Sequence, residues 1–291
     1  NRQIGQMKKR LTKKVLDTFA TLLKDRREDY EKFWRQFGTT IKEGIVFDGD
    51  HREAVAGIAL WPSSAGESLT TLDEHVARLP EDAQEIFYLS ASDASAAARS
   101  PHLEAVKARG REVIFLVDPV DDWVLEHLEE YKEKKLVSIG RGEASWESAT
   151  AKSEREERER DARGFLETLE SALSDDVSRV RFSSRLAESP AVLVDDDDAL
   201  GVHMRRVLQQ THGSVPPQKR VLELNPAHPL IQDLERAQRE SPDPERVKSA
   251  AELLLGQAQL AEGGTLKDPV RFSRLVSDLM LASSRARGPA T

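Results

Sequence analysis

The residues best suited by type to do chemistry are four consecutive aspartates, Asp195 to Asp198, with His203 nearby. Carboxylates and imidazoles can bind a divalent cation when several converge on one point. Adjacent aspartates mostly point apart, however, and carboxylates just before a helix are explained by capping and by the helix dipole. The other six of the seven histidines are scattered, without the spacing of a metal site or of a Ser/His/Asp hydrolase. We therefore expect no metal site and no catalytic residue.

A phosphate-binding site is also poorly supported. An α/β nucleotide site needs a glycine-rich turn after its first strand, but the turn after the apolar run at 86–90 reads Ala91-Ser92-Asp93-Ala94-Ser95. A phosphate-binding α/β enzyme is thus a third-ranked hypothesis, and we expect no bound cofactor.

Composition limits the class of protein. The chain of 291 residues is 38% hydrophobic and 32% charged, long enough for about two globular domains. It has no cysteine, which excludes disulfides and thiolate sites. A net charge of -8 argues against a general nucleic-acid binder, since phosphates need a basic face. Without a signal peptide or an apolar run of about 20 residues, we expect a cytoplasmic protein with no membrane partner.

The first half predicts helices followed by a small α/β unit. Apolar residues at helical spacing predict two packed helices over 7–37, and shorter helices over 51–60 and 72–79, the last opened by a Thr71/Glu74 capping box. Strands at 86–89 and 113–117 flank a helix at 101–109. A helix at 121–131 and a strand at 136–139 complete a three-layer unit with a parallel sheet.

The second half predicts an α+β domain. Residues 140–163 change sharply to Ala, Ser, Glu and Arg, so we place domains at 1–150 and 164–291 with a charged linker or helix at 151–163. Alternating charges there favour a solvated helical face over an interaction tail. A helix at 165–173 and strands at 180–182, 191–194 and 221–224 follow, with a helix at 199–211 before the last strand.

The closing helices, 231–240, 244–262 and 268–283, carry more apolar surface than one partner can cover. Such a surface fits either an internal core or a hairpin that pairs with a second copy in a four-helix bundle. The candidate interface residues are Val247, Ala251, Leu254, Leu255, Ala258, Phe272, Leu275, Val276, Leu279 and Met280.

Several short motifs occur in an order typical of one family. They are Lys32-Phe33-Trp34 with Phe37-Gly38 and Ile41 to Gly44; Ser100 to Glu104 with Gly110, Glu112 and Val113; Ser184-Arg185-Leu186 with Ser189-Pro190-Ala191; Glu223 to Pro226 with His228-Pro229-Leu230; and Gly264-Thr265-Leu266 with Asp268-Pro269. Together they cover nearly the whole chain, which resembles the end of the middle domain plus the C-terminal dimerisation domain of the heat-shock protein 90 chaperone family, in its bacterial form.

The resemblance implies a homodimer that binds unfolded or partly folded clients, with a co-chaperone as a further partner. The ATP and Mg²⁺ of the family belong to an N-terminal ATPase domain that has no counterpart here. This chain, which starts inside a helical pattern, is then a fragment that is not itself an enzyme. The resemblance also implies client contacts at Asp122 and Trp123, and along a mobile helix at Leu200, Met204, Val207 and Leu208. An adaptable methionine and a large ring on a wet surface suit that task. Core packing is the competing interpretation of both.

The runner-up hypothesis is a dimeric scaffold or adaptor. It would use the α/β unit at 85–139 to bind one defined protein partner, whereas a chaperone binds many unfolded chains.

Overall fold

The structure, a computed structural model, describes residues 2–196, 199, 208 and 218–286. It contains two compact units. Unit 1 holds the described stretches 2–98 and 111–138, and unit 2 holds 99–110, 139–196 and 218–286. The crossover segment 99–110 therefore belongs to unit 2, although the strands on either side of it belong to unit 1. None of the described helices is long and apolar enough to cross a membrane.

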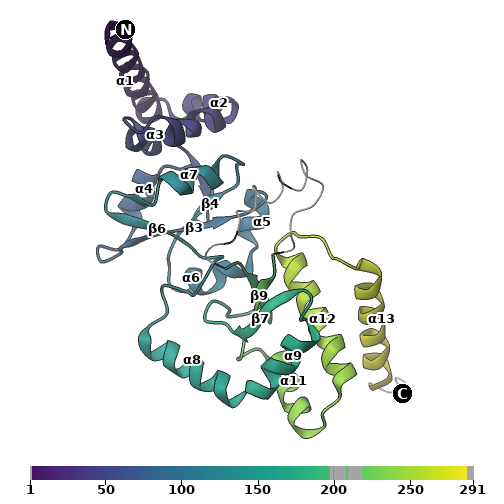
Figure 1. The fold of residues 1–291 in the computed structure, drawn as a ribbon. Coiled ribbons are helices and arrows are strands. Elements are labelled where there is room, and N and C mark those ends of the chain that lie inside the picture. The colour runs from purple at the N-terminus through teal and green to yellow at the C-terminus, as the bar shows by residue number, and fades with distance from the viewer. Residues whose placement is uncertain (1, 197–198, 200–207, 209–217, 287–291) are drawn as a thin grey trace. The chain divides into compact units, whose positions relative to one another are not determined.

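Unit 1 begins with three helices that pack on one another (Figure 1). They are α1 (Arg2–Asp25), α2 (Arg27–Phe47) and α3 (Arg52–Ile58). A single residue, Arg26, separates the first two helices. The aromatic side chains of Phe19, Tyr30 and Phe33 meet at this corner, with ring centroids 4.8 to 6.4 Å apart.

The sheet of unit 1 has six strands in the order β2-β1-β4-β3-β6-β5. Its central strands β3 (Glu85–Ser90), β4 (Val113–Leu116) and β6 (Lys134–Ser138) are parallel, which confirms the predicted βαβ pattern. An antiparallel hairpin, β1 (Trp61–Ser63) and β2 (Gly66–Thr70), extends one edge, and β5 (Glu130–Tyr131) closes the other. Nothing in the sequence pattern predicted β1 or β2, because Pro62 and the serines around Gly66 favour a loop.

Three short helices complete unit 1: α4 (Leu72–Arg78), α5 (Ala94–Ala98) and α7 (Asp121–His127). The predicted capping box of α4 is confirmed, since Thr71 Oγ1 accepts from the Glu74 amide at 3.0 Å and the Glu74 carboxylate accepts from the Thr71 amide at 2.9 Å. The predicted helix at 121–131 is wrong beyond His127. The chain turns there into the β5–β6 hairpin, in which Lys132 and Glu133 both adopt left-handed conformations.

Unit 2 contains a three-stranded sheet in the order β7-β9-β8. The strands are β7 (Val177–Phe182), β8 (Ala191–Val194) and β9 (Arg220–Leu224), close to their predicted positions. β7 and β9 are parallel, and β8 and β9 are antiparallel. The crossover segment supplies the 3-10 helix η1 (Pro101–Leu103) and α6 (Glu104–Ala108).

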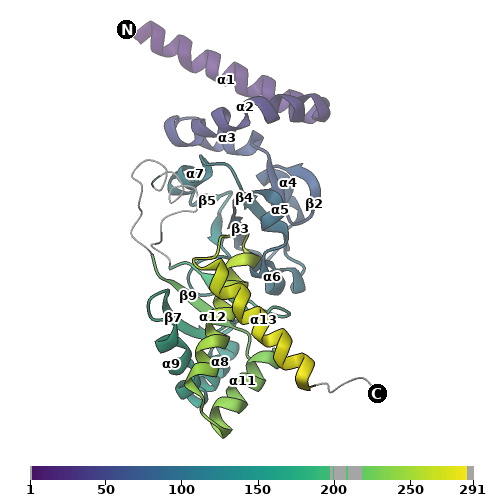
Figure 2. The ribbon, with the colours of Figure 1, turned by 90° about the vertical axis from the view of Figure 1, so that its right-hand side faces the viewer.

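The remaining helices of unit 2 are α8 (Ala149–Asp161), α9 (Arg163–Ala172), α11 (Pro229–Glu240), α12 (Pro244–Ala261) and α13 (Pro269–Ala286). α12 packs against β8 and α9, and α13 packs against α12 (Figure 2). The structure thus confirms a mixed α/β fold with a helical end. The charged run of the predicted linker forms α8, which contributes no buried residue.

Candidate functional site

The predicted client residue Trp123 lies on α7, and its side chain is 44% exposed. Its neighbours Val120 and Val124 are buried below it. The start of α7 is fixed by the buried Lys42, whose ammonium contacts Asp118 at 2.7 Å and Asp121 at 2.8 Å. A rigid helix therefore presents a large ring to solvent, with the half-buried Asp122 beside it.

The predicted client helix lies mostly outside the described residues. Leu200, Met204 and Val207 are among the residues not described, and Leu208 is described as half-buried.

The ten predicted interface residues fall into two groups. Those on α12, which are Val247, Ala251, Leu254, Leu255 and Ala258, are all buried in the core of unit 2. On α13, Leu275 is also buried, while Phe272 and Val276 are half-buried. Phe272 covers Gly256 so closely that a methyl group there would lie 2.5 Å from the ring.

Most of the exposed large apolar side chains of the helical end lie on α13. Leu279 is 57% exposed and Met280 69% exposed. Val270 and Leu281, which sequence reasoning did not single out, are also exposed on α13. The five apolar residues of α12 therefore pack inside the core of unit 2, and the exposed apolar residues lie mainly on α13. Dimerisation through these helices stays a prediction.

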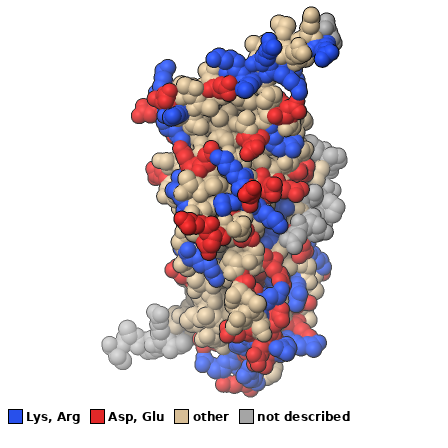
Figure 3. All heavy atoms as spheres, turned by 90° about the vertical axis from the view of Figure 1, so that its left-hand side faces the viewer, with Lys and Arg blue, Asp and Glu red and all other residues tan. Residues whose placement is uncertain are grey.

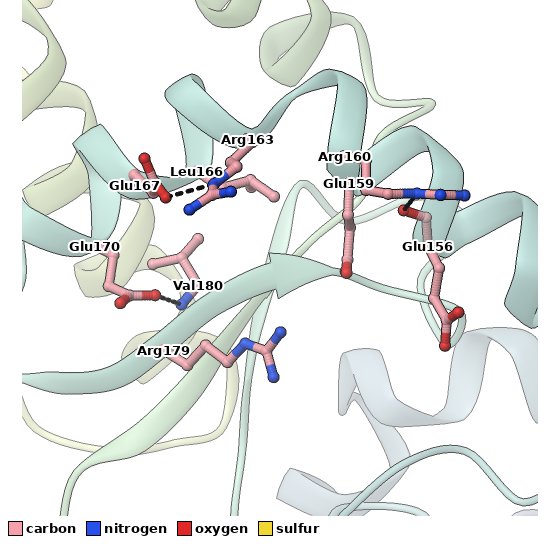
Figure 4. Close-up of a pocket in the computed structure, with 9 residues that line it drawn as sticks. All are labelled: Glu156, Glu159, Arg160, Arg163, Leu166, Glu167, Glu170, Arg179 and Val180. Atoms are coloured by element: carbon pink, nitrogen blue, oxygen red, sulfur yellow. Dashed lines mark hydrogen bonds and ion pairs between the residues drawn. The ribbon is translucent and has the colours of Figure 1, made fainter.

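A hollow of about 570 Å³ lies between α8, α9 and β7 (Figure 4). Four glutamates and three arginines line it, so its charge is nearly balanced. Two of the glutamates cover the free edge of β7: Glu170 accepts from the Val180 amide at 3.0 Å, and Glu159 accepts from the Phe182 amide at 2.9 Å. The glutamates that line the hollow therefore cover the edge of β7. Because the lining carries both signs of charge in nearly equal number, it favours neither an anionic nor a cationic ligand.

On the face shown in Figure 3, basic and acidic side chains are interspersed, without a broad area of one sign. Among the described residues, no group of three or more His, Asp or Glu side chains is placed to hold a metal ion.

Residues from three of the sequence motifs meet inside unit 2. Arg185 is fully buried and donates from Nε to Glu223 at 2.8 Å, while its other nitrogens reach the carbonyls of Ile139 and Gly142 at 2.6 Å. The Glu104 carboxylate accepts from the amides of Ala187, Glu188 and Ser189. Sequence reasoning quoted these residues but gave them no role, because a pattern along one chain does not reveal such pairings.

A second, partly buried cluster joins four segments of unit 2. Arg220 contacts Asp195 at 2.6 Å and Glu262 at 2.6 Å, and His102 Nε2 lies 3.3 Å from Glu262. Burial would raise the pKa of Glu262, but Arg220 and His102 outweigh it and lower that pKa below its ordinary value. Of these four residues only His102 lies in a quoted motif, so the motifs supply only part of the charge contacts within unit 2.

The family model of the Hsp90 protein matches residues 1–287. The chain belongs to the Hsp90 family of heat-shock chaperones. It is 43% identical to the chaperone protein HtpG of Mycobacterium tuberculosis (strain ATCC 25618 / H37Rv) and 40% identical to HtpG of Rhodococcus jostii (strain RHA1), in both cases over 283 residues. Each match covers 96% of this chain but only 44% of the relative. The Hsp90 chain described here therefore spans less than half the length of these HtpG proteins.

Proposed function

We propose that this chain dimerises through its helical end and binds non-native client proteins, as part of a cytoplasmic heat-shock chaperone. The family match along nearly the whole chain supports a chaperone role. The observation that carries the dimer is the exposure of Leu279 and Met280, which continue the face of α13 that carries the half-buried Phe272 and Val276. Clustered apolar side chains at a surface are typical of a protein interface.

Light scattering on the purified chain tests dimerisation. At micromolar concentration we expect twice the mass of one chain. The double substitution Leu279→Glu and Met280→Glu should yield monomers, because it would bury two charges in an apolar interface. Arg274→Glu places one glutamate at an exposed position of the same helix and should leave the dimer intact. A monomeric parent chain, or a double variant that still dimerises, would contradict the proposal.

Suppression of client aggregation tests the second part. Trp123→Ser removes the exposed ring and should weaken suppression several-fold, whereas Glu126→Ser, at an exposed position of the same helix, should not. Equal suppression by both variants would count against Trp123. Many unrelated unfolded chains should compete with one another for binding to this chain. A scaffold with one defined partner would not show such competition.

The ATP-driven cycle of the whole protein requires residues other than these. We expect the chain alone neither to bind nor to hydrolyse ATP with Mg²⁺, and a calorimetric titration checks this. Saturable binding of ATP would refute it.

A further inference from the structure

A groove in unit 1 runs between α1 and α3 and reaches α4 and Tyr131 of β5. Its volume is about 850 Å³, within the range of sites that hold a ligand or a short peptide segment. All of its lining residues belong to unit 1. None of them is a residue that the family resemblance singles out.

The floor of the groove is apolar. Leu16 and Leu23 of α1 face it from one wall, and Ile58 of α3 from the other. Small residues keep the space between the helices open. They are Ala20, Ala54 and Gly57, and the absence of a side chain at Gly57 also lets the Tyr131 hydroxyl approach α3, since a methyl group there would lie 3.0 Å from it. The groove can therefore accept large apolar side chains from outside.

The rim of the groove is acidic. Its lining includes four carboxylates, on Asp17, Glu53, Asp73 and Glu74, but only two basic groups, on Lys24 and Arg27. The Arg27 guanidinium is already engaged, since it donates to Glu31, Glu74 and the Leu69 carbonyl at 2.6 to 2.9 Å. Arg27 pairs with Glu74, and Lys132 pairs with Asp73. Asp17 and Glu53 therefore remain against Lys24, and this excess of one negative charge at the opening favours a cationic occupant.

The end wall is rigid. Tyr131 donates to Asp73 at 2.6 Å, and the Lys132 ammonium contacts the same carboxylate oxygen at 2.6 Å. The left-handed backbone at Lys132 and Glu133 costs energy, and these contacts hold it in place. A fixed wall lowers the entropic cost of binding.

The walls are mainly helical side chains, so they offer few backbone groups to an extended peptide. A helix satisfies its own backbone and needs only an apolar face that fits the floor and basic residues that meet the rim. We propose that this groove binds a cationic amphipathic helix of a partner protein.

A fluorescein-labelled 14-residue peptide of leucine and lysine, patterned as an amphipathic helix, tests the groove by fluorescence anisotropy. We expect saturable binding to the full chain. A scrambled peptide of the same composition and a leucine–glutamate peptide of the same pattern should bind at least tenfold more weakly. Glu53→Lys reverses a rim charge and Ala54→Trp fills the groove from an exposed position of α3, so each should weaken binding at least tenfold.

Matched controls change exposed positions outside the groove. Glu43→Lys on α2 and Ala149→Trp on α8 should bind within twofold of the parent chain. Trp123→Ser should also bind normally, which separates the groove from the proposed client surface. Normal binding by Glu53→Lys and Ala54→Trp, or equal binding of the scrambled peptide, would overturn the proposal. So would self-association that Ala54→Trp abolishes, since it would assign the groove to a second copy.

Discussion

Glu112 illustrates how single carboxylates hold unit 1 together. It accepts from Arg78 through both oxygens at 2.9 Å and from Ser63 at 2.6 Å, and it lies 3.2 Å from His75 Nδ1. Burial alone would raise the pKa of Glu112, but the nearby His75 and the hydrogen bonds from Arg78 and Ser63 outweigh it and lower the pKa from 4.5 to about 2. The ionised carboxylate joins α4, β1 and the start of β4.

This pKa predicts an acid-dependent stability. Because the folded-state pKa lies below the unfolded value, the stabilisation is fully present above pH 4.5 and is lost as the pH falls towards 2. Glu112→Gln should lower the free energy of unfolding by about 2 kcal/mol at pH 7, allowing for the partly exposed Arg78. Urea denaturation should show a smaller difference in unfolding free energy between the variant and the parent chain at pH 3 than at pH 7. The prediction would be contradicted by a free-energy difference that is the same at both pH values. It would also be contradicted if the exposed control Glu43→Gln showed the same difference as Glu112→Gln.

Arg185 plays the corresponding part in unit 2. Replacing it with methionine leaves the buried Glu223 with Arg181 but without its second arginine, and it removes the donor to the Ile139 carbonyl. We expect Arg185→Met to cost about 3–5 kcal/mol of unfolding free energy. Adding Glu223→Leu should recover part of the loss, because it removes a buried carboxylate that has lost one of its two arginine partners. Strictly additive losses in denaturant titrations would show that the two residues are not coupled.

At the scale of elements, β7 shows how unit 2 manages an exposed sheet edge. Its outer amides at Val180 and Phe182 are taken by glutamates from α9 and α8 rather than by another strand. Side chains that occupy edge amides prevent a second chain from pairing there.

Removing both glutamates should expose this edge. We expect Glu159→Ala with Glu170→Ala to aggregate several-fold faster at a temperature below unfolding, measured by light scattering. Glu167→Ala is the matched control, because its carboxylate contacts Arg163 and no strand amide. Equal aggregation rates for the double variant and the control would refute this role.

The sequence predicted elements better than it predicted contacts. Apolar runs located β3, β4, β8 and β9 because buried strands leave a strong local pattern. The β1–β2 hairpin escaped prediction, since Pro62 and Gly66 are loop-forming and its pairing is set by β4. The α12 stripe was ambiguous for a physical reason: an internal core and an interface require the same apolar spacing. Only the structure shows that α9 and β8 cover that stripe.

At the scale of the whole chain, each unit has its own apolar core, one built around Ile45, Trp61 and Ile86 and the other around Phe182, Leu222 and Ala251. Separate cores predict separate unfolding transitions. In calorimetry, Arg185→Met should lower one transition by several degrees and Glu112→Gln the other. A single transition that both variants shift equally would show that the two units unfold together.

The crossover segment 99–110 has a consequence for how such a chain can evolve. Its flanks lie in unit 1, yet Glu104 and His102 are bound into unit 2. Suppose that two relatives recombine at a point after this segment. The segment would then come from one relative, while its contacts Glu262 and the 187–189 loop would come from the other. The two units are therefore expected to be inherited together, as one recombination block.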